Sequence, residues 1–219
     1  MKPKAIVFDA YGTLFDVNSA AEKCKNKIGS KWENFANFWR TTQLEYTWLR
    51  SLMKRHKDFW QVTEDSLDKS MKVFGVDTDM KNELLNLYKI LSPYPEVREV
   101  LENLKKKNFK LAILSNGTYD LLNELVESNK LNNLFDDLFS IEEVKIYKPD
   151  PRVYELPIKK YKFKSKEITF LSANTWDVSG GGNFGYNSIW VNRHNSIFDI
   201  LDFQPKNEIN NLTQLLDIV

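Results

Sequence analysis

The sequence holds a single cysteine and two histidines in 219 residues, and its charges nearly cancel to a formal net charge of +1. One cysteine excludes an intrachain disulfide and a metal site built from several thiolates. A near-zero net charge provides no overall field that would attract nucleic acid or an anionic membrane surface. No apolar run approaches membrane-spanning length. We therefore expect neither nucleic acid nor a membrane as a partner.

The cysteine, Cys24, lies between Lys23 and Lys25, whose charges could lower the pKa of its thiol. Neither His56 nor His194 has a setting that would pair with this thiol in catalysis. We interpret Cys24 as a helix-cap or surface residue and not as a nucleophile. The N-terminus begins with a basic tripeptide and a strand pattern, without the apolar segment of a signal peptide. A cytoplasmic location is therefore expected.

Short apolar runs alternate with helical patterns over most of the chain. The runs predict strands, and the segments between them predict helices at 96–107, 118–128 and 151–161. This alternation favours an α/β fold with a doubly wound, mostly parallel sheet. In such a sheet, ligands bind beyond the carboxyl ends of the strands. The predicted strands are residues 4–9, 109–114, 168–172 and 188–191.

Residues 16–92 interrupt the alternation with a series of helical patterns. The longest, at 31–56, is dense in aromatic and apolar residues; such a stripe is usually core, but it can also wall a pocket or form a dimer seam. A Pro-Tyr-Pro sequence at 93–95 then breaks the helical pattern. We expect an inserted helical cap over 16–92 and a discontinuous α/β core over 1–15 and 93–219. The other cap helices are expected at 18–29, 63–74 and 79–91.

The first strand pattern ends in Asp9, and Gly12 and Thr13 then provide a tight turn and a hydroxyl. An aspartate held in this way can attack an electrophile and form a covalent aspartyl ester. Tyr11 follows two residues later, where an aspartyl-nucleophile phosphatase needs an acid to protonate a poor alkoxide leaving group. A halide leaves as a stable anion and needs no proton. A buried strand that simply ends in Asp before a glycine turn is the alternative interpretation.

Other candidate site residues follow the strands predicted at 109–114 and 168–172 or precede the helix predicted at 151–161. Ser115 and Asn116 could bind an anion, although Ser-Asn-Gly is also an ordinary turn sequence. Lys148, before a Pro-Asp-Pro turn, could favour the ionised form of Asp9, or it could be an exposed loop lysine. Asp177 could orient Lys148 or take a proton from a hydrolytic water, or it could be a helix N-cap. Gly180, Gly181 and Gly182 permit close backbone approach.

Taken together in order, several segments resemble the haloacid dehalogenase (HAD) superfamily, and within it the (S)-2-haloacid dehalogenases, also called type II L-2-haloacid dehalogenases. The resemblance runs from about residue 4 to residue 195 and implies a Rossmann-like HAD core. The tyrosine after the nucleophile, the cap arginine and the Ser-x-Asn-x-Trp-Asp segment are specific to the dehalogenase branch. The segments are DAYGTLFD, FWR with QLEYTWLRSLM, LAILSNG, YKPDPRVYEL, and SANTWD with FGYNSIWVNR.

The resemblance implies that Asp9 displaces halide from the α-carbon of a 2-haloalkanoate with inversion, and that water then hydrolyses the ester. Arg40 matches the residue that meets the departing halide, with Asn116 assisting. The substrate carboxylate is expected on Ser115 and on backbone N–H groups near Tyr11. The other positions that match the family's catalytic or nucleophile-supporting residues are Thr13, Ser115, Lys148, Tyr154, Ser172, Asn174 and Asp177, and those that match its substrate pocket are Ala10, Tyr11, Leu44, Phe59 and Trp176.

The resemblance also implies that no metal or other cofactor is needed, because Lys148 would compensate the carboxylate charge. It further implies a homodimer. Two other functions stay open: a magnesium phosphatase of the same superfamily, and a non-catalytic binding module.

The sequence also departs from the family pattern. Thr41 stands where a larger polar residue is expected, which would alter the pocket or the hydrogen bonding of the cap. Pro157 is expected to kink a helix or end it early, and Gly181 and Gly182 replace better helix formers.

Overall fold

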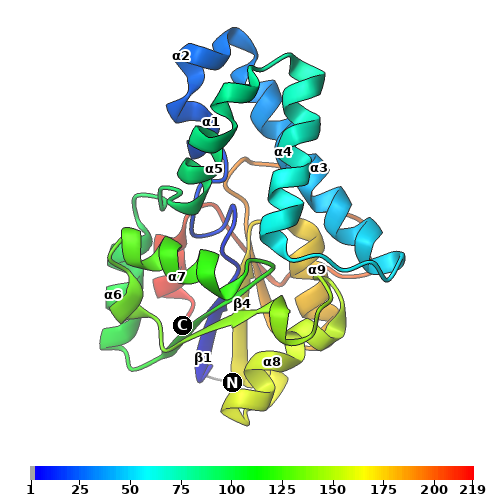
Figure 1. Cartoon of the computed structure of the whole chain (residues 1–219). Helices are drawn as coiled ribbons and strands as arrows, with labels where there is room; N and C mark the ends of the chain where they lie inside the picture. Colours follow the sequence, from blue (N-terminus) through cyan, green and yellow to red (C-terminus); the bar gives the residue numbers. More distant parts are fainter. Residues whose placement is uncertain (1–2) are drawn as a thin grey trace.

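A parallel β-sheet forms the centre of the protein (Figure 1). The computed structural model describes residues 3–219, so residues 1 and 2 of the expected core segment lie outside the described residues. Six strands lie in the order β3-β2-β1-β4-β5-β6, and every neighbouring pair is parallel. The doubly wound α/β fold expected from the sequence is confirmed. The strands are β1 (Ala5–Phe8), β2 (Lys110–Ser115), β3 (Asp137–Ser140), β4 (Ile168–Ser172), β5 (Asn187–Val191) and β6 (Asn207–Ile209).

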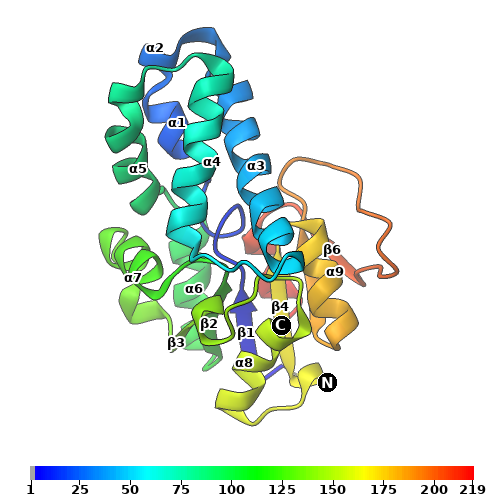
Figure 2. The ribbon, with the colours of Figure 1, turned by 45° about the vertical axis from the view of Figure 1, so that its right-hand side comes forward.

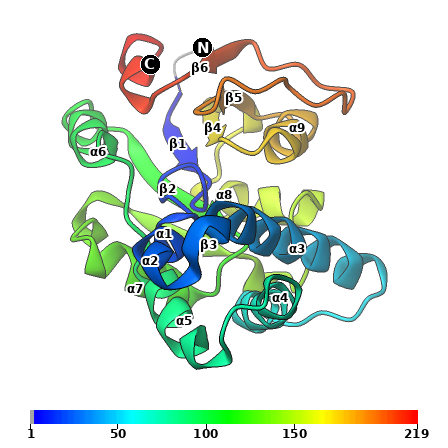
Figure 3. The same ribbon diagram turned by 90° about the horizontal axis from the view of Figure 1, so that it is seen from above.

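Helices cover both faces of this sheet, as the view from above shows (Figure 3). They form where apolar residues recur at helical spacing: α6 buries Val97, Val100, Leu101 and Leu104. The hydroxyl of Thr118 accepts a hydrogen bond from the Leu121 N–H and caps the start of α7. The helices are α6 (Val97–Lys106) and α7 (Tyr119–Ser128) on one face, and α8 (Pro151–Tyr161) and α9 (Thr175–Phe184) on the other.

A second group of helices stands over the carboxyl ends of the strands and forms the cap (Figures 1 and 2). Local sequence signals set both ends of the cap helix α4 (Phe59–Phe74). The Asp58 side chain accepts a hydrogen bond from the Gln61 N–H at its start, and Gly75 ends it in the left-handed conformation, with φ of 57°. No helix within residues 3–219 is long and apolar enough to cross a membrane. The cap helices are α1 (Ser19–Lys23), α2 (Lys25–Ile28), α3 (Trp32–Leu52), α4 (Phe59–Phe74) and α5 (Lys81–Lys89).

Several details of the fold differ from the sequence-based expectations. Strands β3 and β6 were not expected; they are only four and three residues long and partly exposed. The expected helix 18–29 is divided at Cys24, which caps both α1 and α2 but is buried, so a surface position was wrong. Burial, with the Glu83 carboxylate nearby, raises the pKa of the Cys24 thiol, whereas its lysine neighbours had suggested a lower value.

The helix α8 does not end early at Pro157 and continues to Tyr161. Pro157 has no N–H to donate to the carbonyl of Val153, which normally destabilises a helix interior. The proline ring lies on the buried face of α8, beside the buried Leu156. Packing of this face against the sheet therefore maintains the last turn of the helix.

Candidate active site

Three polar strand ends meet at one place, because β1 lies between β2 and β4. Phe8 is in register with Ile113 on one side and with Leu171 on the other, and the N–H of Asp9 donates to the Leu171 carbonyl (2.8 Å). The chain order also reverses between β1 and β4, which is the place where α/β sheets bind ligands. The sheet thus delivers Asp9 to the centre of its carboxyl edge.

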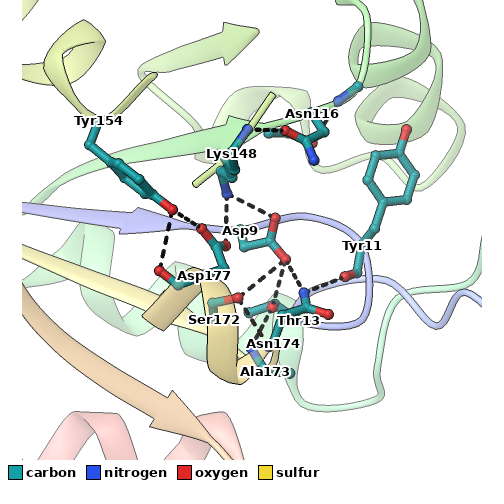
Figure 4. Close-up of polar contacts among 12 residues, drawn as sticks. Asp9, Tyr11, Thr13, Asn116, Lys148, Tyr154, Ser172, Ala173, Asn174 and Asp177 are labelled. Atoms are coloured by element: carbon teal, nitrogen blue, oxygen red, sulfur yellow. Dashed lines mark hydrogen bonds and ion pairs between the residues drawn. The ribbon is translucent and has the colours of Figure 1, made fainter. Parts of the chain in front are cut away.

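The two carboxylate oxygens of Asp9 have different partners (Figure 4). Oδ2 accepts hydrogen bonds from Thr13 Oγ1 (3.1 Å), Asn174 Nδ2 (2.9 Å) and Ser172 Oγ (3.4 Å). Oδ1 has the Lys148 ammonium as its one partner in the described chain, at 3.1 Å. The side chain is 7% exposed. Asp9 is therefore held rigidly through Oδ2, while Oδ1 is the less encumbered oxygen.

Lys148 joins Asp9 to a second buried carboxylate, that of Asp177, at 2.9 Å. Burial disfavours the ammonium, but Asp177 and Asp9 outweigh this effect and raise the pKa of Lys148. Burial also raises the pKa of Asp177; Lys148 opposes this and Asp9 adds to it, with a result of about 6. Within residues 3–219 no group of three or more His, Cys, Asp or Glu side chains is placed to hold a metal ion. The Lys148 ammonium contacts both carboxylates, at 3.1 Å from Asp9 Oδ1 and 2.9 Å from Asp177 Oδ2.

Tyr154, on α8, completes this network by donating its hydroxyl to Asp177 Oδ1 (2.7 Å). Burial and the Asp177 charge raise the pKa of Tyr154 well above 10, so the phenol stays protonated and acts as a donor. Gly180 makes the contact possible, since a Cβ at that position would lie 2.5 Å from the Tyr154 hydroxyl oxygen and 2.7 Å from Pro149 Cβ. The glycine permits α8 and α9 to approach closely at the site, as the sequence had suggested.

The loop after Asp9 is tied down on both sides. The Ala173 N–H donates to Thr13 Oγ1 (2.8 Å), and the Ala10 carbonyl accepts from the Leu14 N–H (3.0 Å). Arg193, whose role the sequence did not indicate, donates to the Thr13 carbonyl (2.8 Å) and pairs with Glu96 (2.8 Å). These contacts fix the Thr13 hydroxyl against Asp9.

Arg40 reaches this loop from the cap helix α3. Its Nη2 donates to the Tyr11 carbonyl (3.4 Å), which also accepts from Asn174 Nδ2 (3.2 Å). Its Nη1 donates to Gln43 Oε1 (2.9 Å), a partner the sequence analysis missed although it lies three residues later on the same helix. Thr41, expected to alter the pocket, is instead exposed on the surface of α3.

The expected pocket residues lie around the junction of cap and core. The Phe59 ring, fully buried at the start of α4, packs on the Tyr11 ring with centroids 5.2 Å apart. Leu44 lies one turn after Arg40 on α3 and is partly buried. Trp176, on α9, packs edge-on against Trp48 of α3, with ring centroids 5.4 Å apart. Aromatic side chains from the cap and from the core therefore meet at this junction.

Ser115 and Asn116 tighten the neighbouring loops. Ser115 Oγ accepts from the Gly117 N–H (3.0 Å), and Asn116 Oδ1 accepts from the Lys148 N–H (3.1 Å). Both side chains are buried. The Asn116 contact places the lysine loop beside Asp9, and within residues 3–219 the Asn116 amide N–H groups have no hydrogen-bond acceptor.

The site thus combines a doubly wound sheet, a buried aspartate at the end of its central strand, and a lysine that pairs with this aspartate beneath a helical cap. Residues 3–185 match the model of the haloacid dehalogenase-like hydrolase family, and the chain belongs to that family. It is 42% identical over 214 residues to (S)-2-haloacid dehalogenase 1 of Pseudomonas sp. strain CBS-3, a match that covers 97% of this chain and 94% of the relative.

Solved structures agree closely with this fold. The crystal structure of a dehalogenase with an intermediate complex matches with a TM-score of 0.97 at 36% identity, covering 100% of this chain and 97% of the other. The L-2-haloacid dehalogenase from Xanthobacter autotrophicus with chloropropionic acid covalently bound matches with a TM-score of 0.92 at 32% identity, covering 99% and 98%. The resemblance found in the sequence to the (S)-2-haloacid dehalogenase branch is thereby confirmed.

Proposed function

We propose that this protein is a hydrolytic dehalogenase that converts L-2-haloalkanoic acids into D-2-hydroxyalkanoic acids and releases halide. The observation that supports the proposal most strongly is the environment of Asp9, which is buried beside a lysine and held through one oxygen by three donors. Tyr11 stands where a phosphatase needs a general acid, which a leaving halide does not require. The relative named above is an (S)-2-haloacid dehalogenase by name, and its sequence similarity to this chain extends over nearly the full length of both.

In the first step, Oδ1 of Asp9 attacks the α-carbon of the substrate, the carbon–halogen bond breaks, and the halide leaves with the bonding electron pair. Attack from the side opposite the halide inverts the α-carbon and forms an aspartyl ester. Arg40 receives the halide, with Asn116 assisting. The substrate carboxylate rests on Ser115 and on N–H groups near Tyr11.

In the second step, water attacks the ester carbonyl carbon. Oδ2 is then the carbonyl oxygen, and the donors from Thr13, Asn174 and Ser172 stabilise the negative charge that develops on it. Asp177 takes a proton from the attacking water, and this proton passes to the departing oxygen of the hydroxy acid. The ester bond breaks, the second proton of the water is released from the Asp9 carboxyl group to solvent, and Asp9 is regenerated as a carboxylate.

The test of this proposal is halide release from each enantiomer of 2-chloropropionate, measured in EDTA with the purified protein. We expect release from the L-form only, with the D-form of lactate as product. Hydrolysis of p-nitrophenyl phosphate that depends on magnesium, without halide release, would instead support the phosphatase alternative. Equal release from both enantiomers would contradict the proposed stereochemistry.

The hydrolysis step is expected to slow as the pH falls below 6. Asp177 must be ionised to accept a proton, and its pKa is about 6 while the Asp9 charge is present. Esterification removes that charge, which had raised the pKa, so the midpoint for decay of the ester should lie below pH 6. Rapid quenching with mass spectrometry of the intact protein measures this decay. A decay rate that does not change between about pH 4 and pH 8 would contradict the role of Asp177.

Tyr154→Phe provides a matched variant for this pH profile. The Tyr154 hydroxyl stabilises the ionised form of Asp177 and so lowers its pKa. Its removal should move the midpoint to higher pH while the chemistry at Asp9 remains available.

We further propose the domain division expected from the sequence, with a cap over 16–92 on a core of 1–15 and 93–219, and a homodimer with α3 at the seam. The apolar side chains Leu49, Leu52 and Met53 at the end of this helix are exposed by 42%, 80% and 60%, which supports a partner surface there. Residues 1 and 2 of the proposed core lie outside the described part of the chain.

A further inference from the structure

One buried amide connects the three longest helices of the cap. Gln43 on α3 is 1% exposed, and its side chain contacts Thr63 on α4 and Tyr88 on α5. Nε2 donates to Thr63 Oγ1 (2.7 Å) and to the Tyr88 hydroxyl (3.0 Å), while Oε1 accepts from Arg40 Nη1 (2.9 Å). All polar atoms of the amide therefore have partners inside the cap.

The partners also determine which way round the amide lies. Thr63 Oγ1 donates its single hydroxyl proton to the Phe59 carbonyl (2.7 Å), so toward Gln43 it can act only as an acceptor. The Gln43 group facing Thr63 must consequently be the NH₂ group. Its carbonyl oxygen is then turned toward Arg40, and in this orientation it accepts the hydrogen bond from the guanidinium.

The contacts hold Arg40 without cancelling its charge. The oxygens that its guanidinium contacts are neutral, among them Gln43 Oε1 and the backbone carbonyl of Tyr11, and it forms no ion pair with any carboxylate in residues 3–219. The other partly buried arginines behave differently: Arg50 pairs with Asp65 and Arg193 pairs with Glu96. Arg40 is thus a fixed cation that keeps its attraction for an anion.

We propose that Gln43, oriented by Thr63, is the positioning residue that presents Arg40 as an uncompensated cation to the departing halide. The inference rests on the proposed function, in which Arg40 receives the halide. It assigns the neutral amide a specific purpose, since a carboxylate at this position would hold the guanidinium equally well but would neutralise it.

Gln43→Glu tests this proposal, because it keeps the shape of the side chain and places a carboxylate against Arg40. We expect kcat for L-2-chloropropionate to fall by about 100-fold, with a change in KM below about tenfold, and bromide affinity of the resting protein to be lost. The matched control is Thr41→Glu, which adds the same charge to an exposed position beside Arg40. Its kcat and bromide affinity should equal those of the wild type.

The orientation of the amide is tested separately by two substitutions of Thr63. Thr63→Val removes the acceptor that fixes the Gln43 NH₂ group and should weaken bromide binding by about tenfold. Thr63→Ser retains the hydroxyl and should restore wild-type affinity. Thermal unfolding of each variant shows whether the cap remains folded.

Bromide binding is measured on the resting protein by bromide NMR line broadening, so this result does not depend on turnover. If the wild type binds bromide and Gln43→Glu does not, the positioning role holds, even where an absence of halide release overturns the proposed function. Bromide binding by folded Gln43→Glu with wild-type affinity would overturn the inference, as would a wild type that does not bind bromide.

Discussion

Asp9→Asn is expected to lower the rate of halide release from L-2-chloropropionate by about 10⁵-fold, which is the scale of losing a covalent nucleophile. An amide oxygen is a far weaker nucleophile than a carboxylate oxygen, and the NH₂ group would face either the Lys148 ammonium or the donors on Oδ2. The measurement is steady-state halide release with enzyme at high concentration. Asp120→Asn, at an exposed position on α7, is the matched control and should retain full activity.

Intact mass before and after incubation shows whether the new asparagine has itself been hydrolysed to aspartate. A variant of confirmed mass that keeps more than about one hundredth of the wild-type rate would contradict covalent catalysis by Asp9. Binding of the substrate is expected to persist in Asp9→Asn, since Ser115 and Arg40 are unchanged. That combination also separates an enzyme from a module that only binds carboxylates.

Lys148→Met is expected to reduce the free energy of unfolding by about 3–5 kcal/mol at pH 8, because it leaves two buried carboxylates without their shared cation. Asp9 and Asp177 both contact the Lys148 ammonium, which is itself fully buried. Without this ammonium, the lysine no longer offsets the effect of burial or the repulsion between the two carboxylates. The pKa of Asp177 should therefore rise above its wild-type value of about 6. Urea unfolding at several pH values measures the loss.

The pH dependence of this loss identifies its cause. A carboxyl group whose folded pKa lies above its unfolded value destabilises the protein as the pH rises through that folded pKa. The deficit of Lys148→Met should therefore be large at pH 8 and smaller at pH 5, where Asp177 is protonated. Lys159→Met, which removes an exposed lysine paired with Glu155, should cost less than about 1 kcal/mol at either pH. A deficit of equal size for both variants would contradict the account.

Much of the sheet, with the polar residues at its carboxyl edge, could be predicted from the sequence, because both depend on strong local signals. An apolar run that ends in Asp9 and another that ends in Ser172 predict strand ends, and parallel strands bring such ends together. These strand ends are decided by neighbours in the sequence and by the topology. The residues around Lys148 left open whether it is fixed beside Asp9 or exposed in a loop, and only the family resemblance assigned it to the site, where the structure buries it.

Contacts between distant side chains could not be predicted in the same way. The Gln43 network joins α3, α4 and α5, and no local pattern indicates that Thr63 and Tyr88 meet there. Cys24 has lysines on both sides yet is buried, because the packing of α1 against α3 and α5 decides its environment. Strand β6 consists of three mostly polar residues, and its pairing with β5 is what makes it a strand.

The measurement that tests the central claim most directly is a single turnover of L-2-chloropropionate in H₂¹⁸O, with enzyme in excess over substrate. If Asp9 forms an ester and water attacks its carbonyl, the first hydroxy acid produced carries unlabelled oxygen, taken from Asp9. The ¹⁸O then appears in the peptide that contains Asp9. If the hydroxy acid carries ¹⁸O and Asp9 does not, water displaces the halide directly, and the assignment of Asp9 as the nucleophile is wrong.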